Sequence, residues 1–90
     1  MLTVTIPAAL REQVGNQERI EVEASTVGEA LKKLAAEYPE FGGRLFKTED
    51  VLNRFINAYL NDEDIRFLED LETPVKAGDE LAIIPAIAGG

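Results

Sequence analysis

Alternation of apolar and polar residues predicts two strands near the N-terminus. Residues 2–6 are Leu-Thr-Val-Thr-Ile, and residues 19–23 are Arg-Ile-Glu-Val-Glu. A period of two places successive side chains on opposite faces of a sheet, so each segment is typical of a strand with one buried face. Pro7 ends the first strand, and Gly15-Asn16-Gln17 predicts the turn of a hairpin between the two.

A change to helical spacing follows the second strand. Thr26 and Glu29 stand three residues apart, which is the spacing of a capping box at a helix start. Apolar residues then form one stripe, made of Val27, Ala30, Leu31, Leu34, Ala35 and Tyr38. Pro39 disfavours helical geometry at the residue before it, so we expect the helix to end at Tyr38.

The second half of the chain predicts further strands around a loop. Residues 40–54 are interrupted by Gly42-Gly43 and predict a loop with one or two short helical turns. Residues 55–60 predict a strand, residues 61–64 a polar turn, and residues 65–67 a short strand that pairs back. Residues 81–84 are all apolar, which is typical of a central strand buried on both faces or covered by a partner.

This order of elements predicts an α+β fold, in which one main helix packs across one face of a mixed sheet. Ninety residues leave room for a single hydrophobic core. We therefore expect one domain over residues 1–85. Residues 86–90, Ala-Ile-Ala-Gly-Gly, lie beyond the last strand and are expected to form a flexible tail.

Strand alternation also assigns the two faces of this sheet. The helix-facing set is Leu2, Val4, Ile6, Ile56, Ala58, Leu60, Leu81 and Ile83, and the opposite set is Thr3, Thr5, Pro7, Asn57, Tyr59, Ala82 and Ile84. In the second set, Pro7, Tyr59 and Ile84 are candidates for an exposed apolar patch that binds a protein partner. The alternative is that Tyr59 and Ile84 are ordinary half-buried sheet residues.

Composition narrows the function. The chain has 17 acidic and 9 basic residues, a net charge of −8, and neither cysteine nor histidine. Nucleic-acid binding requires the opposite balance of charge, so we expect no DNA or RNA partner. No apolar run is long enough to span a bilayer, and no signal peptide is recognisable, so we expect no membrane partner and a cytoplasmic location.

The acidic run Asp62-Glu63-Asp64 is the one candidate for a metal site. A calcium loop would need further oxygen ligands and a glycine at set positions, which the following residues do not supply. We therefore expect a hydrated turn, no metal and no intrinsic cofactor. A domain of this size is also expected to leave little room for a catalytic cleft with paired carboxylates.

The terminal Gly89-Gly90 is the most informative feature for function. A frayed chain end is the ordinary interpretation of terminal glycines. A carboxylate presented on a narrow tail can instead enter an enzyme that adenylates it with ATP and replaces oxygen by sulfur. Glycine lacks a Cβ and passes a constriction easily, and four extended residues reach ~14 Å from the domain. Ala88, also small, precedes the pair.

The closing residues 77–90, Ala-Gly-Asp-Glu-Leu-Ala-Ile-Ile-Pro-Ala-Ile-Ala-Gly-Gly, resemble the end of the ubiquitin-like sulfur carriers of the ThiS/MoaD family. The resemblance implies a ubiquitin-like β-grasp fold and a protein co-substrate rather than an enzyme. It implies that an ATP-dependent, ubiquitin-activating-like enzyme adenylates and sulfurylates Gly90 to a thiocarboxylate. By the same resemblance, Gly89 and Ala88 form the narrow approach, while Ile87 and Pro85 anchor the tail's base in a partner groove.

Two branches of the family are possible. Residues 54–67 and the ending at residues 85–90 are similar to CysO-type carriers of cysteine biosynthesis. That branch implies sulfur transfer to O-phosphoserine on a pyridoxal-phosphate cysteine synthase, followed by trimming by a metalloprotease. The alternative is the small subunit of molybdopterin synthase, whose tail enters the large subunit and donates sulfur to a pterin precursor. A ubiquitin-like modifier joined to lysines, and a binding module with an inert tail, also remain open.

Overall fold

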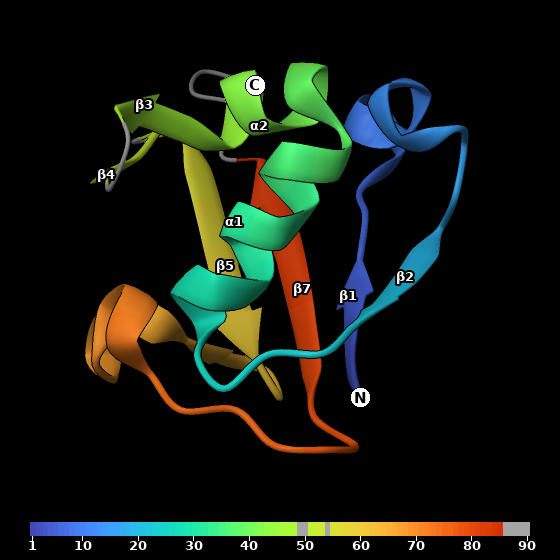
Figure 1. Ribbon diagram of the computed structural model, residues 1–90. Coiled ribbons are helices and arrows are strands. Elements are labelled where there is room, and N and C mark those ends of the chain that lie inside the picture. The colour runs from blue at the N-terminus through green and yellow to red at the C-terminus, as the bar shows by residue number, and fades with distance from the viewer. Residues whose placement is uncertain (49–50, 54, 86–90) are drawn as a thin grey trace.

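The computed structural model describes residues 1–48, 51–53 and 55–85, and it places a helix across one face of a mixed sheet (Figure 1). The sheet contains β1 (Leu2–Thr5), β2 (Arg19–Val22), β5 (Ile56–Leu60), β6 (Glu63–Asp64) and β7 (Glu80–Pro85). Their order is β2-β1-β7-β5-β6. The central strand, β7, runs parallel to β1 and antiparallel to β5. This is the expected β-grasp arrangement, and the prediction of a central strand at residues 81–84 is confirmed.

The connection between β1 and β2 is longer than the predicted turn. The two strands pair antiparallel, as expected for a hairpin. A 3₁₀ helix, η1 (Ala8–Val14), lies between them and buries Leu10 and Val14 in the core. The chain then reverses at Gly15 and Asn16, both with positive φ, where glycine and asparagine are tolerated. The turn was therefore located correctly, but η1 was not predicted.

The main helix, α1 (Val27–Glu37), begins as predicted. The Glu29 amide donates to Oγ1 of Thr26 at 3.1 Å, and the Glu29 carboxylate accepts from the Ser25 amide at 2.6 Å. The reciprocal bond thus falls one residue before the cap. The apolar stripe of α1 packs onto the sheet, and the helix ends before Pro39.

The region predicted as a loop is more regular than expected. Pro39 not only ends α1 but also starts a second helix, α2 (Pro39–Leu45), at a position where proline's missing N–H costs nothing. Gly42 lies inside α2, although the sequence predicts a break there. The packing of α2 on α1 requires glycine at this position, because a Cβ would stand 2.6 Å from the Cβ of Ala35 on α1. Beyond α2, β3 (Phe46–Thr48) and β4 (Val51–Leu52) form a small separate sheet that was not predicted.

The predicted short strand at residues 65–67 is wrong. These residues form a 3₁₀ helix, η2 (Ile65–Phe67), and the returning strand is β6 instead. Asn61 and Asp62, both with positive φ, make the tight turn between β5 and β6. The carboxylate of Asp64 then accepts from the Arg66 amide at 2.9 Å, which bends the backbone out of the strand. A further 3₁₀ helix, η3 (Asp70–Glu72), precedes β7.

The predicted assignment of sheet faces is confirmed. All eight residues of the helix-facing set are buried, and the opposite set is half-buried apart from the exposed Ile84. Phe41 and Leu45 of α2 and Ile65 of η2 complete the core. The burial of one face leaves the other face of the sheet as the surface on which a site can be built.

Candidate functional site

The open face of the sheet presents the predicted apolar patch around the end of β7. Ile84 is 43% exposed, whereas Tyr59, Pro7 and Pro85 are half-buried. Ala82 stands directly opposite Tyr59 in the β5–β7 ladder. Ile84 is therefore the most exposed of the predicted patch residues, and Tyr59 and Pro7 are less exposed.

A row of side chains crosses this face from one edge strand to the other. Thr5 of β1 pairs with Arg19 of β2 on one side and with Ala82 of β7 on the other. Tyr59 continues the row, and its partner in β6 is Asp64. Cross-strand partners point to the same face, so the small central residues of the row are bounded by charged groups at both ends.

The charged end at β6 is a fixed ion pair. Arg66 bonds Asp64 through both guanidinium Nε and Nη2, the latter at 2.7 Å. The side-chain hydrogen bonds from Arg66 are the main cause of a lowered pKa at Asp64, and the same pair raises the pKa of Arg66. Sequence reasoning did not single out Arg19 or Arg66. Strand alternation in β2 would have placed Arg19 on the open face, next to Thr5. The position of Arg66 depends on η2, which was not predicted.

The root of the tail is held by the middle of the sheet. Pro85 pairs with Ile56, and Ile84 pairs with Asn57, so β7 is bonded to β5 up to its last described residue. A tail that continues from β7 therefore starts from a defined position. The other predicted tail residues, Ile87, Ala88, Gly89 and Gly90, lie outside the described residues.

Asp79 fixes the opposite end of β7. Its carboxylate accepts from the Lys76 amide at 2.9 Å and from the Asn61 side chain at 3.1 Å, and its carbonyl accepts from the Thr3 amide at 3.0 Å. The bond from the Lys76 amide, followed by that from Asn61, lowers the pKa of Asp79. Asp79 therefore joins β1, β7 and the β5–β6 turn.

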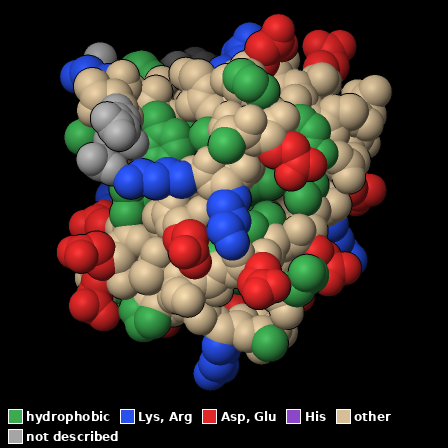
Figure 2. Space-filling view, in the orientation of Figure 1, with side chains coloured by type: hydrophobic (Ala, Val, Ile, Leu, Met, Phe, Trp, Pro, Cys, Tyr) green, Lys and Arg blue, Asp and Glu red, His purple; other side chains and the backbone are tan. Residues whose placement is uncertain are grey.

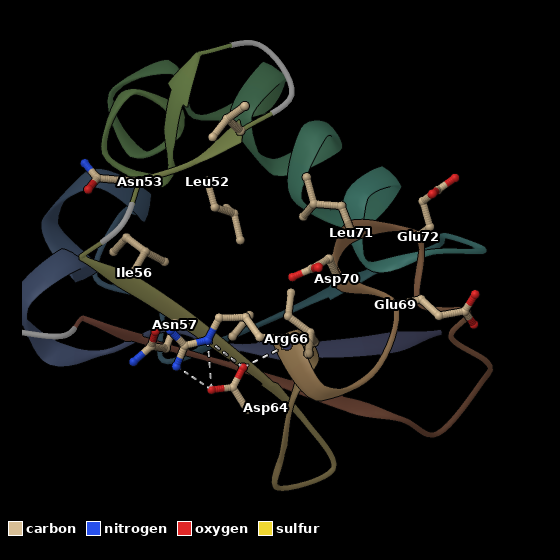
Figure 3. A pocket seen from close by; sticks show the side chains of 13 residues that line it. Leu52, Asn53, Ile56, Asn57, Asp64, Arg66, Glu69, Asp70, Leu71 and Glu72 are labelled. Atoms are coloured by element: carbon tan, nitrogen blue, oxygen red, sulfur yellow. Dashed lines mark hydrogen bonds and ion pairs between the residues drawn. The ribbon is translucent and has the colours of Figure 1, made fainter.

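A groove of about 600 Å³ lies beside β5, under η2, η3 and β4 (Figure 3). Leu52, Ile56 and Leu71 point toward its interior, and the Asp64–Arg66 pair stands at one end. The expectation that the domain leaves little room for a cleft was therefore wrong. Asp64 in this groove is held ionised by Arg66, so it does not have the raised pKa of a general acid.

The described residues carry charges of both signs and lack a cluster that could hold a metal ion. On the helix side of the molecule, acidic and basic side chains are interspersed (Figure 2). Among the described residues, no cluster of three or more potential Asp or Glu ligands is placed to hold a metal ion. None of the helices in that part of the chain has the length and hydrophobicity that crossing a bilayer requires.

Fold and site together define a class: a ubiquitin-like β-grasp domain in which the last described strand, β7, is the central strand of the sheet. The chain belongs to the ThiS family, whose model matches residues 4–90. It is 40% identical to the sulfur carrier protein CysO of Mycobacterium tuberculosis, over 99% of this chain and 98% of that protein. ThiS- and CysO-like sulfur carriers are small protein carriers and not catalysts.

Two further relatives match most of the chain. A chain in the crystal structure of the Amycolatopsis orientalis BexX/CysO complex superposes with a TM-score of 0.90 at 42% identity, and the match covers 100% of both chains. Small archaeal modifier protein 3 of Haloferax volcanii is 34% identical over 92% of this chain and 91% of that protein. The ubiquitin-like fold and the similarity to sulfur carriers, expected from the closing residues, are thus confirmed.

Proposed function

We propose that this protein carries sulfur as a thiocarboxylate on Gly90 and delivers it for cysteine biosynthesis. The similarity to CysO along nearly the whole length of both chains is the observation that carries this proposal. The family match also extends to Gly90, so the closing residues take part in the similarity. The fold supports it because β7 gives the tail a fixed starting point next to an accessible apolar patch.

Loading takes two steps on a partner enzyme. A carboxylate oxygen of Gly90 attacks the α-phosphorus of ATP, pyrophosphate leaves, and an acyl-adenylate forms. The sulfur of a sulfide donor then forms a bond to the acyl carbon, the bond from that carbon to the AMP oxygen breaks, and AMP leaves with the electron pair. The thiocarboxylate remains on Gly90. This chain contributes the reacting carboxylate, the narrow Gly89 and Ala88 approach, and the docking surface formed by Ile84, Pro85 and their neighbours.

Delivery forms a carbon–sulfur bond. The thiocarboxylate sulfur attacks the β-carbon of a serine unit derived from O-phosphoserine, and phosphate is the leaving group. Pyridoxal phosphate on the acceptor, a cysteine synthase, supplies the activation of that serine unit. The product is a thioester, and its free amine then attacks the acyl carbon, so that sulfur leaves as a thiol and a peptide bond to cysteine forms. A metalloprotease hydrolyses that bond with water, which releases cysteine and regenerates the Gly90 carboxylate.

Loading is tested by intact-mass measurement after incubation with ATP, a sulfide source and the activating enzyme. The unmodified chain is expected to gain the mass of one oxygen-to-sulfur exchange at its C-terminus. Gly89→Val should abolish that gain without unfolding the domain, because the branched side chain blocks the narrow approach. The control is Ala36→Val, which adds similar bulk at an exposed position of α1. Normal loading of Gly89→Val would contradict the steric argument.

Delivery is tested by mixing the thiocarboxylate form with O-phosphoserine and a cysteine synthase. A cysteine added to the C-terminus supports this branch. Sulfur transfer to a pterin precursor, in the presence of a molybdopterin synthase large subunit, would favour the alternative branch. Transfer to neither acceptor would contradict both assignments while leaving the loading reaction intact.

A second candidate is a protein modifier, favoured by the similarity to small archaeal modifier protein 3. In that case the activated Gly90 carboxyl forms an isopeptide bond with a lysine amine, and AMP leaves. Mass mapping of conjugates after activation separates the two candidates. The last Lys or Arg of the chain is Lys76, so cleavage after Lys and Arg leaves residues 77–90 on a modified lysine. Branched peptides that carry this segment indicate modification, and a thiocarboxylate without them indicates carriage alone.

A further inference from the structure

The sheet has an uncovered edge at β2. This strand is last in the sheet order, and no helix or strand of the described residues lies along its outer side (Figure 1). The Ile6 amide donates to the Glu18 carbonyl at 2.9 Å, which fixes the alternation of backbone groups. Ile20 and Val22 consequently turn their amides and carbonyls toward β1, while Arg19 and Glu21 turn theirs outward. Among the described residues, none bonds these outward groups.

The side chains along this edge are complementary to themselves. Arg19 pairs with Thr5, and Glu21 pairs with Thr3, so both project from the open face of the sheet, and both are exposed. They carry opposite charges two residues apart. Between them, Ile20 projects from the helix-covered face and is half-buried.

We propose that β2 pairs antiparallel with β2 of a second copy of this chain, centred on Ile20. In that register Arg19 stands opposite Glu21 of the second copy, and the reverse pair forms by symmetry. Both are outward-facing residues, so each pair exchanges two backbone hydrogen bonds. The same register therefore joins opposite charges on one face and the two Ile20 side chains on the other.

The surroundings of the edge permit this pairing and limit its length. A hollow of about 530 Å³, lined by residues that include Ile20, Glu37 and Tyr38, lies next to the strand. Toward its C-terminal end, the carbonyl of Glu23 is already bonded by the Lys33 ammonium group. Toward the other end, the Gln17 amide donates to the Val14 carbonyl at 3.3 Å. The pairing is therefore confined to residues 19–21, and we expect a weak dimer.

A dimer of this kind leaves both tail roots accessible. Five strand spacings separate the two β7 strands, which places them ~24 Å apart. The two-fold axis of an antiparallel β2–β2 pair reverses every strand of the second copy, so the two β7 strands end at opposite ends of the joined sheet. Each tail could be loaded without the other, and the dimer does not depend on the proposed tail chemistry.

Charge reversal tests the register. Sedimentation equilibrium of the full chain, up to ~1 mM at constant ionic strength, measures the association. Arg19→Glu and Glu21→Arg each place like charges opposite one another twice, so each is expected to weaken association about tenfold. The double variant Arg19→Glu/Glu21→Arg restores both pairs and should recover the dimer. Arg44→Glu and Glu12→Arg make the same charge changes at exposed sites away from β2 and serve as controls.

Amide exchange measured by NMR provides the second test. Raising the protein concentration should slow exchange at the amides of Arg19 and Glu21, and leave those of Ile20 and Val22, which already bond β1, unchanged. The proposal is overturned if the chain stays monomeric at ~1 mM. It is equally overturned if the double variant associates no better than the single ones, or if the controls weaken association as much.

Discussion

Ile83 and Ile84 are neighbours in the same strand, yet they serve opposite sides of the molecule. Ile83 is 2% exposed and packs in the core beneath α1, whereas Ile84 is 43% exposed on the open face. Both residues are isoleucine and have the same strand propensity, so their difference in exposure comes only from the pleat of β7. The comparison teaches that one strand can hold the fold together with alternate residues and present a partner surface with the others.

Truncation of each isoleucine is the most direct test of whether only the buried face of β7 stabilises the fold. Ile83→Ala removes buried methyl groups and leaves a cavity, so it should lower the free energy of unfolding by about 2–5 kcal/mol. Ile84→Ala should lower it by less than about 1 kcal/mol. Urea titrations of both variants provide the measurement. Equal losses would show that the two faces do not differ in their contribution to stability.

The adjacent residues Gly42 and Gly43 of α2 provide the same contrast between a buried and an exposed position in a helix. A Cβ at Gly42 would lie 2.6 Å from the Cβ of Ala35, whereas a Cβ at Gly43 would meet nothing within 4 Å. Gly42→Ala should therefore cost about 1–3 kcal/mol through overpacking between α1 and α2. Gly43→Ala should stabilise the protein by roughly 0.5–1 kcal/mol, because alanine loses less entropy in a helix. Thermal unfolding of both variants measures the difference, and a shift of the same sign in both would contradict it.

The smallest effect is expected at the start of β7, where Asp79 is buried and its neighbour Glu80 is exposed. The pKa of Asp79 is lowered in the folded state, so its contribution is fully present above the ordinary aspartate pKa of about 3.9. That contribution is lost as the pH falls through the lowered folded value. Asp79→Asn should therefore destabilise the protein near pH 7 and make unfolding less sensitive to pH below about 4.

Unfolding titrations between neutral and acidic pH measure this pH dependence. Glu80→Gln removes one carboxylate at the adjacent exposed position and is the matched control. A pH dependence that disappears in Glu80→Gln but persists in Asp79→Asn would contradict the role given to the Lys76 and Asn61 bonds.

Elements with a strong apolar period were predictable from sequence, and those set by one or a few specific contacts were not. The sheet faces and α1 follow directly from repeated apolar positions and from the Thr26 cap. In contrast, the packing of α2 on α1 depends on the close approach of Gly42 to Ala35, a tertiary contact that no local pattern reveals. Residues 65–67 are too short to distinguish a strand from a 3₁₀ helix, and the Asp64 bond to the Arg66 amide decides between them.

The candidate site also contains residues that strand alternation predicts and residues that it does not. Tyr59, Ile84 and Pro7 were placed on the open face by alternation alone, and their exposure agrees with that placement. Arg66 reaches the site through η2, and the groove depends on how η3 and β4 fold over β5. Such features arise from the packing of irregular segments, for which the spacing of apolar residues carries little information.

The parallel pairing of β1 with β7 has a consequence for biosynthesis. The strand that completes the middle of the sheet is the last of its five strands to be translated, so β1 must wait for its neighbour β7 until the other three strands have been made. Long sequence separation between paired segments slows folding. The nascent polypeptide therefore cannot finish its core while β7 is still missing. Completion of the core and placement of Pro85, the last described residue of β7, therefore belong to the same folding step.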